Sequence, residues 1–308
     1  MRTSRRELLT GLAALAAAGP RPVVAASERA GPEKAFAPRV GYAAITWGGA
    51  DRQAILDVAA VGFRGIQLRA SVVLEFEAKP AELRRLLDDH GIKLLCFSSG
   101  SVDASPDKRG EYLEKHTRHA KFVAALGGPF LQLLSNRPQD RAPTAEEFER
   151  LGALLTEIGR RTADLGVRLV YHNHMRAFGE SPEEVARVIE LSEPRFLSLL
   201  LDIAHYQLGG GDPAQGLRRH RERLAVVHLK DAIAPLPGAT GDLRYSYKFV
   251  ELGRGKVDVP AAVATLREIG YGGDVIVELD APPEPGKTPK ECAVLNKAYV
   301  TEKLGLTL

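Results

Sequence analysis

Short apolar runs alternate with amphipathic stretches along most of this chain, beginning near residue 40. The runs are rich in Val, Ile and Leu, as is typical of strands that are buried on both faces. We expect eight strands, at residues 40–45, 65–68, 93–97, 130–133, 167–171, 197–201, 225–229 and 274–277.

The stretches between these runs place apolar residues at three- and four-residue spacing, which predicts helices. They cover residues 52–61, 80–90, 109–126, 145–165, 182–191, 213–220, 259–269 and 290–303. Five of them are followed by a glycine, which favours a left-handed cap: Gly62, Gly91, Gly127, Gly166 and Gly270. Eight β-α units in one chain of this length predict a single-domain α/β fold, the (β/α)8 TIM barrel.

A doubly wound nucleotide-binding sheet is the competing α/β fold. It would need a G-x-G-x-x-G fingerprint after a strand, and neither this motif nor a P-loop occurs. The connection at 232–247 is long and rich in Pro and Gly, and follows the seventh expected strand. We expect it to be a mobile lid, because active sites of barrel enzymes lie on that face.

The first 26 residues resemble an export signal, with basic residues, an apolar run at 8–18 and small residues at Ala25 and Ala26. The segment Ser4-Arg5-Arg6-Glu7-Leu8-Leu9 resembles a twin-arginine motif. We therefore expect a periplasmic protein without stable membrane insertion after cleavage, with a linker at 27–38 and the barrel at 39–308. An ordinary Sec signal or a retained anchor is the alternative.

Charge and cysteine content limit the classes of binding partner and of covalent cross-link that the chain can have. Four arginines and one glutamate in the signal account for the whole formal charge of +3, so the mature chain is near neutral. No basic run is interleaved with aromatic residues, which argues against nucleic acid as a partner. Cys96 and Cys292 are too few for a disulfide framework. A small-molecule substrate is expected, and a homo-oligomer remains open.

Four expected strands end in groups that bind metals. The expected strand at 167–171 leads into His172 and His174, which stand on alternate positions, so both side chains point to one face. Asp202, His228 and Glu278 end three later strands. Because the carboxyl ends of barrel strands surround one cavity, we expect these groups to bind one divalent cation. Imidazole and carboxylate ligands suit Mn²⁺, Co²⁺, Zn²⁺ or Fe²⁺; four unrelated polar strand ends are the alternative.

The same segments carry a family resemblance that covers nearly all of the chain after the signal. The chain resembles the xylose-isomerase-like TIM barrel superfamily, the sugar phosphate isomerase/epimerase family, and its motifs are most similar to those of inosose dehydratases. The matching segments are GYAAITW, VYHNHM, LLDIAH, GGDPAQ, VVHLKD, GRGKVD and VIVELD. The resemblance implies that Asp202, His228 and Glu278 bind the metal, Mn²⁺ or Co²⁺ before Zn²⁺ or Fe²⁺. His172 stands where relatives usually have a glutamate ligand, and His174 then faces the substrate.

Further roles follow from the resemblance. Dehydration next to a ketone needs a metal to polarise the carbonyl and groups that move protons, for which His174, His205 and Lys230 are candidates. Asp231 is a candidate to hold Lys230, and a surface ion pair is the favoured alternative. Substrate contacts are expected from three further residues: Trp47 stacking on a sugar face, Gln67, and Arg254 against an anionic group. The alternatives are core packing for Trp47 and a simple turn for Arg254.

Three functions remain in competition. The epimerases of the superfamily use a pair of glutamates, and one of that pair is absent here, which favours a metal-dependent lyase or dehydratase acting on a keto-sugar or keto-polyol. A sugar isomerase or epimerase of the same fold is the alternative. A non-catalytic exported sugar-binding barrel is the second alternative. Endonuclease IV is a poor fit, because the earlier strand ends lack the histidines of its three-metal cluster.

Overall fold

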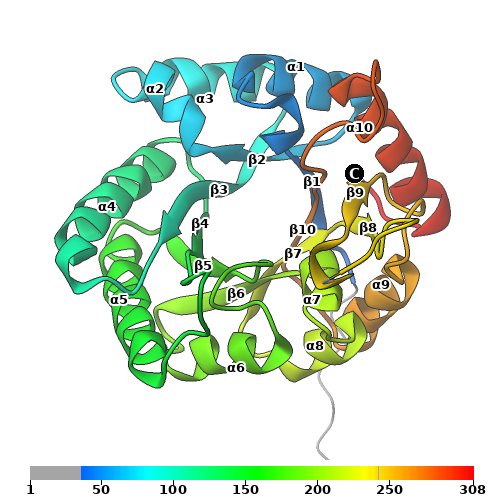
Figure 1. The fold of residues 1–308 in the computed structure, drawn as a ribbon. Helices are drawn as coiled ribbons and strands as arrows, with labels where there is room; N and C mark the ends of the chain where they lie inside the picture. Colours follow the sequence, from blue (N-terminus) through cyan, green and yellow to red (C-terminus); the bar gives the residue numbers. More distant parts are fainter. Residues whose placement is uncertain (1–35, 242) are drawn as a thin grey trace, which may run out of the picture. The chain divides into compact units, whose positions relative to one another are not determined.

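A computed structural model describes residues 36–241 and 243–308 of the chain. Eight parallel strands close into a barrel in the order β1-β10-β7-β6-β5-β4-β3-β2 (Figure 1). All eight expected strands are present, so the prediction of a (β/α)8 barrel is confirmed. Their bounds are β1 Arg39–Ala43, β2 Gly65–Arg69, β3 Lys93–Val102, β4 Phe130–Ser135, β5 Arg168–His172, β6 Leu197–Asp202, β7 Leu224–Leu229 and β10 Asp274–Val277.

The expected helices surround this barrel (Figure 1). The glycines that follow five of them have positive φ angles, as a left-handed cap requires. Capping boxes start α5, α6 and α10. The helices are α1 Asp51–Val61, α3 Pro80–Asp89, α4 Arg109–Ala125, α5 Ala145–Ala163, α6 Pro182–Glu190, α8 Pro213–Arg219, α9 Val259–Glu268 and α10 Pro289–Ala298, with a π-helix at Tyr299–Lys303.

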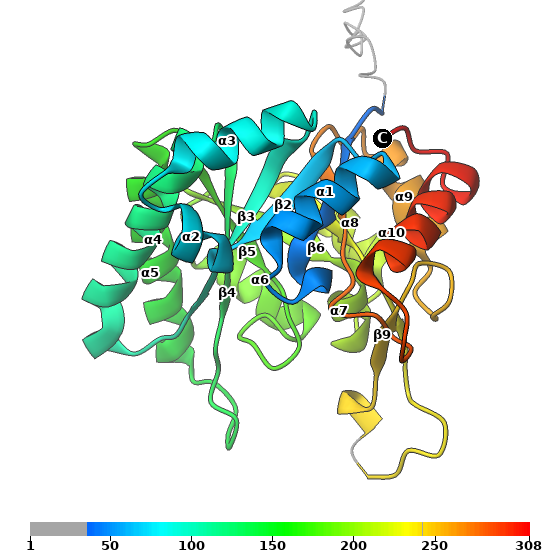
Figure 2. The ribbon, with the colours of Figure 1, turned by 90° about the horizontal axis from the view of Figure 1, so that it is seen from above.

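Several short elements were not expected from the pattern. Helices α2 (Val73–Phe76) and α7 (Ile203–Leu208) are too short to show a helical period. The long connection after β7 begins and ends in an antiparallel pair, β8 (Asp231–Ile233) and β9 (Lys248–Val250). Its middle part extends away from the barrel strands (Figure 2).

The strand side chains contribute to two apolar cores, one on each face of the barrel wall. Side chains on the outer face of the strands pack against the helices in one large core. A small apolar layer fills the barrel interior, made by Ala43, Leu95, Cys96, Val170, Leu200, Val226 and Ile276. In a strand, the next residue that points to the same side lies two positions further along. Four interior residues are therefore followed, towards the carboxyl ends, by His172, Asp202, His228 and Glu278.

Asp231 organises the backbone beside the barrel mouth and does not hold Lys230 as expected. It is fully buried, and its carboxylate accepts hydrogen bonds from the N–H groups of Ala232, Gly253, Gly255 and Val257, at 2.8–3.0 Å. A β-carbon at Gly255 would overlap this carboxylate, so the turn needs a glycine there.

Replacing Asp231 by asparagine is expected to destabilise the fold. An amide keeps one acceptor oxygen and points an NH₂ group at two backbone donors, which are left buried without partners. Hydrogen bonds to charged groups contribute about 1.5–3 kcal/mol each, so we expect a loss of roughly 3 kcal/mol in the free energy of unfolding. Urea denaturation measures this, with the exposed Asp107→Asn as the control that should stay unchanged.

The expected export signal at 1–26 and most of the expected linker at 27–38 lie outside the described residues. Within residues 36–241 and 243–308, no helix combines the length and apolar character needed to cross a bilayer.

Candidate metal centre

The four predicted ligand residues meet at the carboxyl-terminal end of the barrel. His172 ends β5, Asp202 ends β6, His228 lies in β7 and Glu278 follows β10. One ligand atom from each lies within 4.8 Å of those of the other three, and all four residues are buried. The geometry follows from the barrel, because each residue occupies the first inward-pointing position above the apolar layer.

Three atoms of this cluster have no hydrogen-bond partner although they are buried: His172 Nδ1, Asp202 Oδ2 and His228 Nδ1. His228 Nδ1 lies 3.7 Å from Asp202 Oδ2 and 3.4 Å from Glu278 Oε2. Buried polar atoms normally find partners, and each one left without a partner costs about 1–3 kcal/mol. Two imidazoles and two carboxylates aimed at one point are a donor set that fits a divalent transition metal.

The electrostatics of the cluster also favour a positive charge at this point. Burial alone would lower the pKa of His228, but the carboxylates of Glu278 and Asp202 raise it to about 9. A divalent cation would supply the same compensation and leave His228 neutral, as a metal ligand must be.

Gln67 orients two members of the cluster. Its Oε1 lies 2.9 Å from His228 Nε2, and its Nε2 donates to Glu278 Oε2 at 3.4 Å. A proton on His228 Nε2 then donates to Gln67 and leaves the Nδ1 lone pair pointing into the cluster, an arrangement common around metal-binding histidines. Gln67 is only 2% exposed, and the substrate contact expected from the sequence stays a prediction.

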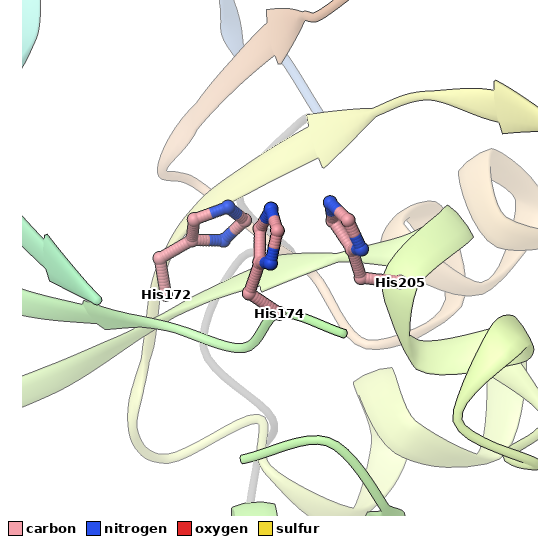
Figure 3. A group of neighbouring side chains, drawn as sticks. All are labelled: His172, His174 and His205. Carbon is pink, nitrogen blue, oxygen red and sulfur yellow. The ribbon is translucent and has the colours of Figure 1, made fainter. Parts of the chain in front are cut away.

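A second group of three histidines adjoins the cluster. His172, His174 and His205 have ring nitrogens within 4.8 Å of one another, with His205 supplied by α7 (Figure 3). His174 Nδ1 lies 2.6 Å from the carbonyl oxygen of Met175, which can only accept, so this nitrogen carries the proton. His174 Nε2 therefore keeps its lone pair. The rings of His174 and His205 lie 3.8 Å apart.

Lys230 is fully buried beside both groups. Its Nζ donates to Glu278 Oε1 at 3.0 Å and to Asp280 Oδ1 at 2.6 Å, and lies 4.1 Å from the centre of the Phe249 ring. Burial alone would lower the pKa of Lys230, but Glu278 and Asp280 raise it above its ordinary value. Asp280, two positions after Glu278 in the segment that follows β10, was not expected from the sequence.

His205 contacts two hydrogen-bond donors. The Met175 N–H lies 3.3 Å from its Nδ1, and Lys230 Nζ lies 3.4 Å from its Nε2. A neutral imidazole has one acceptor nitrogen, so only one of these contacts is a hydrogen bond at a time. Burial, together with His174 and Lys230, holds the pKa of His205 well below its usual value.

Two residues expected to bind substrate have other roles. Trp47 is packed in the core, where its Nε1 donates to Asp57 Oδ2 at 2.9 Å and its ring contacts Tyr42 edge-on. The stacking role is therefore replaced by the core packing that the sequence left open. Arg254 pairs with Glu251 at 3.0 Å and Glu284 at 2.6 Å, so its charge is already compensated within the chain.

The long connection after β7 contacts the segment that follows His174. The Tyr245 hydroxyl donates to Glu180 Oε1 at 2.9 Å, and the Arg176 guanidinium lies 4.4 Å from the centre of the Tyr245 ring. Arg176 has a positive φ of 62°, which is uncommon for a residue with a side chain. This connection is therefore anchored beside the histidine group.

Comparison with known proteins places this barrel in a family. The model of a family described as "Xylose isomerase-like TIM barrel" matches residues 55–298. The chain belongs to this family. The rhizopine catabolism protein MocC of Rhizobium meliloti is 30% identical over 75% of this chain and 75% of its own. An inosose dehydratase of Lacticaseibacillus casei is 26% identical over 82% of this chain and 90% of its own.

Two solved structures share the fold of this chain. A crystal structure of IOLI protein with a bound zinc atom superposes with a TM-score of 0.72, at 18% identity, over 87% of this chain and 98% of that one. A structure of L-ribulose 3-epimerase gives a TM-score of 0.71 at 18% identity, over 87% of this chain and 95% of that one.

Proposed function

We propose that this protein is a divalent-metal-dependent enzyme that removes a proton next to the carbonyl of a keto-sugar or keto-polyol, in a dehydratase or lyase reaction. The observation that carries the proposal is the convergence of four buried ligand residues, His172, Asp202, His228 and Glu278, with His228 Nδ1 and Asp202 Oδ2 facing each other without hydrogen-bond partners. The similarity to inosose dehydratases over most of both chains supports the reaction type.

His172, Asp202, His228 and Glu278 would hold the cation, which when bound polarises a carbonyl oxygen. His174 Nε2 has a free lone pair at the edge of the cluster and is the base that accepts the substrate proton. Lys230 presents a fixed ammonium beside Glu278 and His205, and stabilises negative charge that develops on a substrate oxygen. The ring of His205 lies 3.8 Å from that of His174. His205 takes up the proton from His174 and delivers it to the hydroxyl group, which leaves as water.

A sugar isomerase or epimerase is the second candidate, because two adjacent imidazoles can return a proton to the substrate after removing it. The structural similarity to L-ribulose 3-epimerase is in keeping with the barrel that such an enzyme uses. A non-catalytic sugar-binding barrel is the third candidate. Mass spectrometry of products separates them: loss of water indicates a dehydratase, an unchanged mass indicates an isomerase, and no product indicates a binding protein.

Elemental analysis of the purified protein, followed by a screen of oxidised sugars and inosose, tests the proposal. We expect one divalent ion per chain, with Mn²⁺ or Co²⁺ preferred over Zn²⁺ or Fe²⁺. A chelator should abolish turnover, and added metal should restore it. A protein that binds none of these ions would contradict every metal-dependent mechanism for this site.

Changing Gln67 to methionine is expected to weaken metal binding without removing a ligand. The variant loses the acceptor that fixes the His228 ring, while its volume stays similar. Loss of such an orienting partner typically costs about 10–100-fold in metal affinity, and we expect a change of that size. Competition with a fluorescent chelator measures the affinity, and an unchanged affinity would contradict the orienting role.

We also propose that the protein acts in the periplasm, after export through the twin-arginine route. The motif at Ser4 to Leu9 supports this. Arg5→Lys together with Arg6→Lys should leave the protein in the cytoplasm, as fractionation of cells would detect.

A further inference from the structure

The strands opposite the metal cluster carry polar side chains that none of the roles described above uses. In the closed order of the barrel, β2, β3 and β4 face β6, β7 and β10 across the interior (Figure 1). A small molecule bound at Asp202, His228 and Glu278 therefore extends towards β2, β3 and β4.

Three residues on these strands form one row. Arg69 pairs in register with Ser98, and Ser98 pairs with Gln132. Their neighbours along the strands point outwards: Leu68, Phe97, Leu131 and Leu133 belong to the core between barrel and helices, and Ser99 contacts the histidines of α4. By alternation, Arg69, Ser98 and Gln132 point into the barrel mouth.

Gln132 is 3% exposed, and its Oε1 is buried without a hydrogen-bond partner. Its register partner on β5 is Val170, two positions before His172, so its backbone lies one pleat below the cluster. A buried amide without a partner is costly, and either of its polar atoms would find one in a sugar hydroxyl. Ser98 adds a second hydroxyl-binding group beside it.

Arg69 is a charged group in the same row. It lies two positions after Gln67, which contacts Glu278 and His228, so it occupies the next inward position towards the opening. Among the described residues, no carboxylate forms an ion pair with it. Burial raises the pKa of Asp51, and the charge of Arg69 opposes that rise. Asp51 Oδ2 accepts from the Ser71 hydroxyl, and its Oδ1 is buried without a hydrogen-bond partner. Arg254, by contrast, is fully engaged by Glu251 and Glu284.

We propose that Arg69, Ser98 and Gln132 form the recognition half of the substrate site, and that Arg69 selects substrates carrying an anionic group, a carboxylate or a phosphate, at the end remote from the reacting carbonyl. The guanidinium matches such oxygens with paired hydrogen bonds. Ser98 and Gln132 bind the intervening hydroxyls. This inference rests on the proposed function for the direction in which the substrate lies. The recognition of the anionic group depends on Arg69 alone.

Isothermal titration of the full chain with D-glucuronate, D-glucose and D-glucose 6-phosphate tests the inference, in the metal-loaded and the metal-stripped protein. We expect an anionic sugar to bind at least about tenfold more tightly than glucose, as expected for a charge-assisted pair. Tighter binding of glucuronate assigns the anion as a carboxylate, and tighter binding of glucose 6-phosphate assigns it as a phosphate.

Arg69→Gln should remove this preference and leave glucose affinity unchanged. The matched control is Arg64→Gln, an exposed arginine just before the same strand, which should keep the preference. Gln132→Met should weaken all three sugars equally without changing their ratio.

Equal affinities in the unmodified protein, no binding of any of the three sugars, or a preference that survives in Arg69→Gln would each overturn the inference. A chain that binds no metal but still prefers anionic sugars through Arg69 would refute the proposed function and leave this inference standing.

Discussion

Replacing His228 by alanine is expected to abolish metal binding and, with it, turnover. His228 Nδ1 lies next to two carboxylates and is fixed by Gln67, so its loss removes an oriented ligand from a cluster of four. A metal stabilises developing charge on a substrate oxygen by several kcal/mol, so we expect kcat/KM to fall by about 10³-fold or more. Elemental analysis and steady-state kinetics on the same preparation measure both effects.

Two further variants make this result specific. His90→Ala removes an exposed histidine at the end of α3 and should leave metal content and activity unchanged. Asp202→Asn keeps the side-chain volume and should still lose the metal, so a loss in His228→Ala cannot be ascribed to a cavity. Circular dichroism checks that each variant is folded. Full metal content in His228→Ala would contradict the assigned cluster.

Replacing His174 by glutamine is expected to abolish turnover while the metal stays bound. The Nδ1 proton of His174 is held by the Met175 carbonyl, so its Nε2 is the nitrogen with a free lone pair. General base catalysis contributes about 10²–10⁴-fold, and we expect kcat to fall by that factor with little change in KM. Exchange of the substrate α proton with deuterated water should slow by the same factor.

The matched variant is His172→Gln, because both histidines come from the same strand end. It should lose the metal as well as activity, since His172 belongs to the group that includes Asp202, His228 and Glu278. The opposite pattern, with metal lost from the His174 variant and retained in the His172 variant, would exchange the two roles.

The apolar runs and the strand ends could be read from the sequence because they depend on local pattern. Alternation within a strand places His172 above Val170 and His228 above Val226, and closure of the barrel then brings them together. The helix ends were accessible for the same reason, through glycines that adopt positive φ angles.

The sequence could not show which distant residue each polar side chain contacts. Gln67 contacts His228, 161 residues away, and Arg254 contacts Glu284; neither pairing has a signal in spacing. Trp47 follows the first strand, yet a short 3-10 turn directs it to Asp57 on α1. Asp231 follows Lys230, but four backbone N–H groups compete successfully for its carboxylate.

Inside the barrel, the apolar residues that stabilise the fold lie deeper than the polar residues of the proposed metal site. Val170, Leu200, Val226 and Ile276 fill the lower interior, and the residues proposed to hold the metal stand one pleat above them. Exchanging the upper set for other ligands would leave the lower packing intact. Different metal sites could thus arise on the same barrel through four substitutions, each two residues beyond the apolar layer that fills its interior.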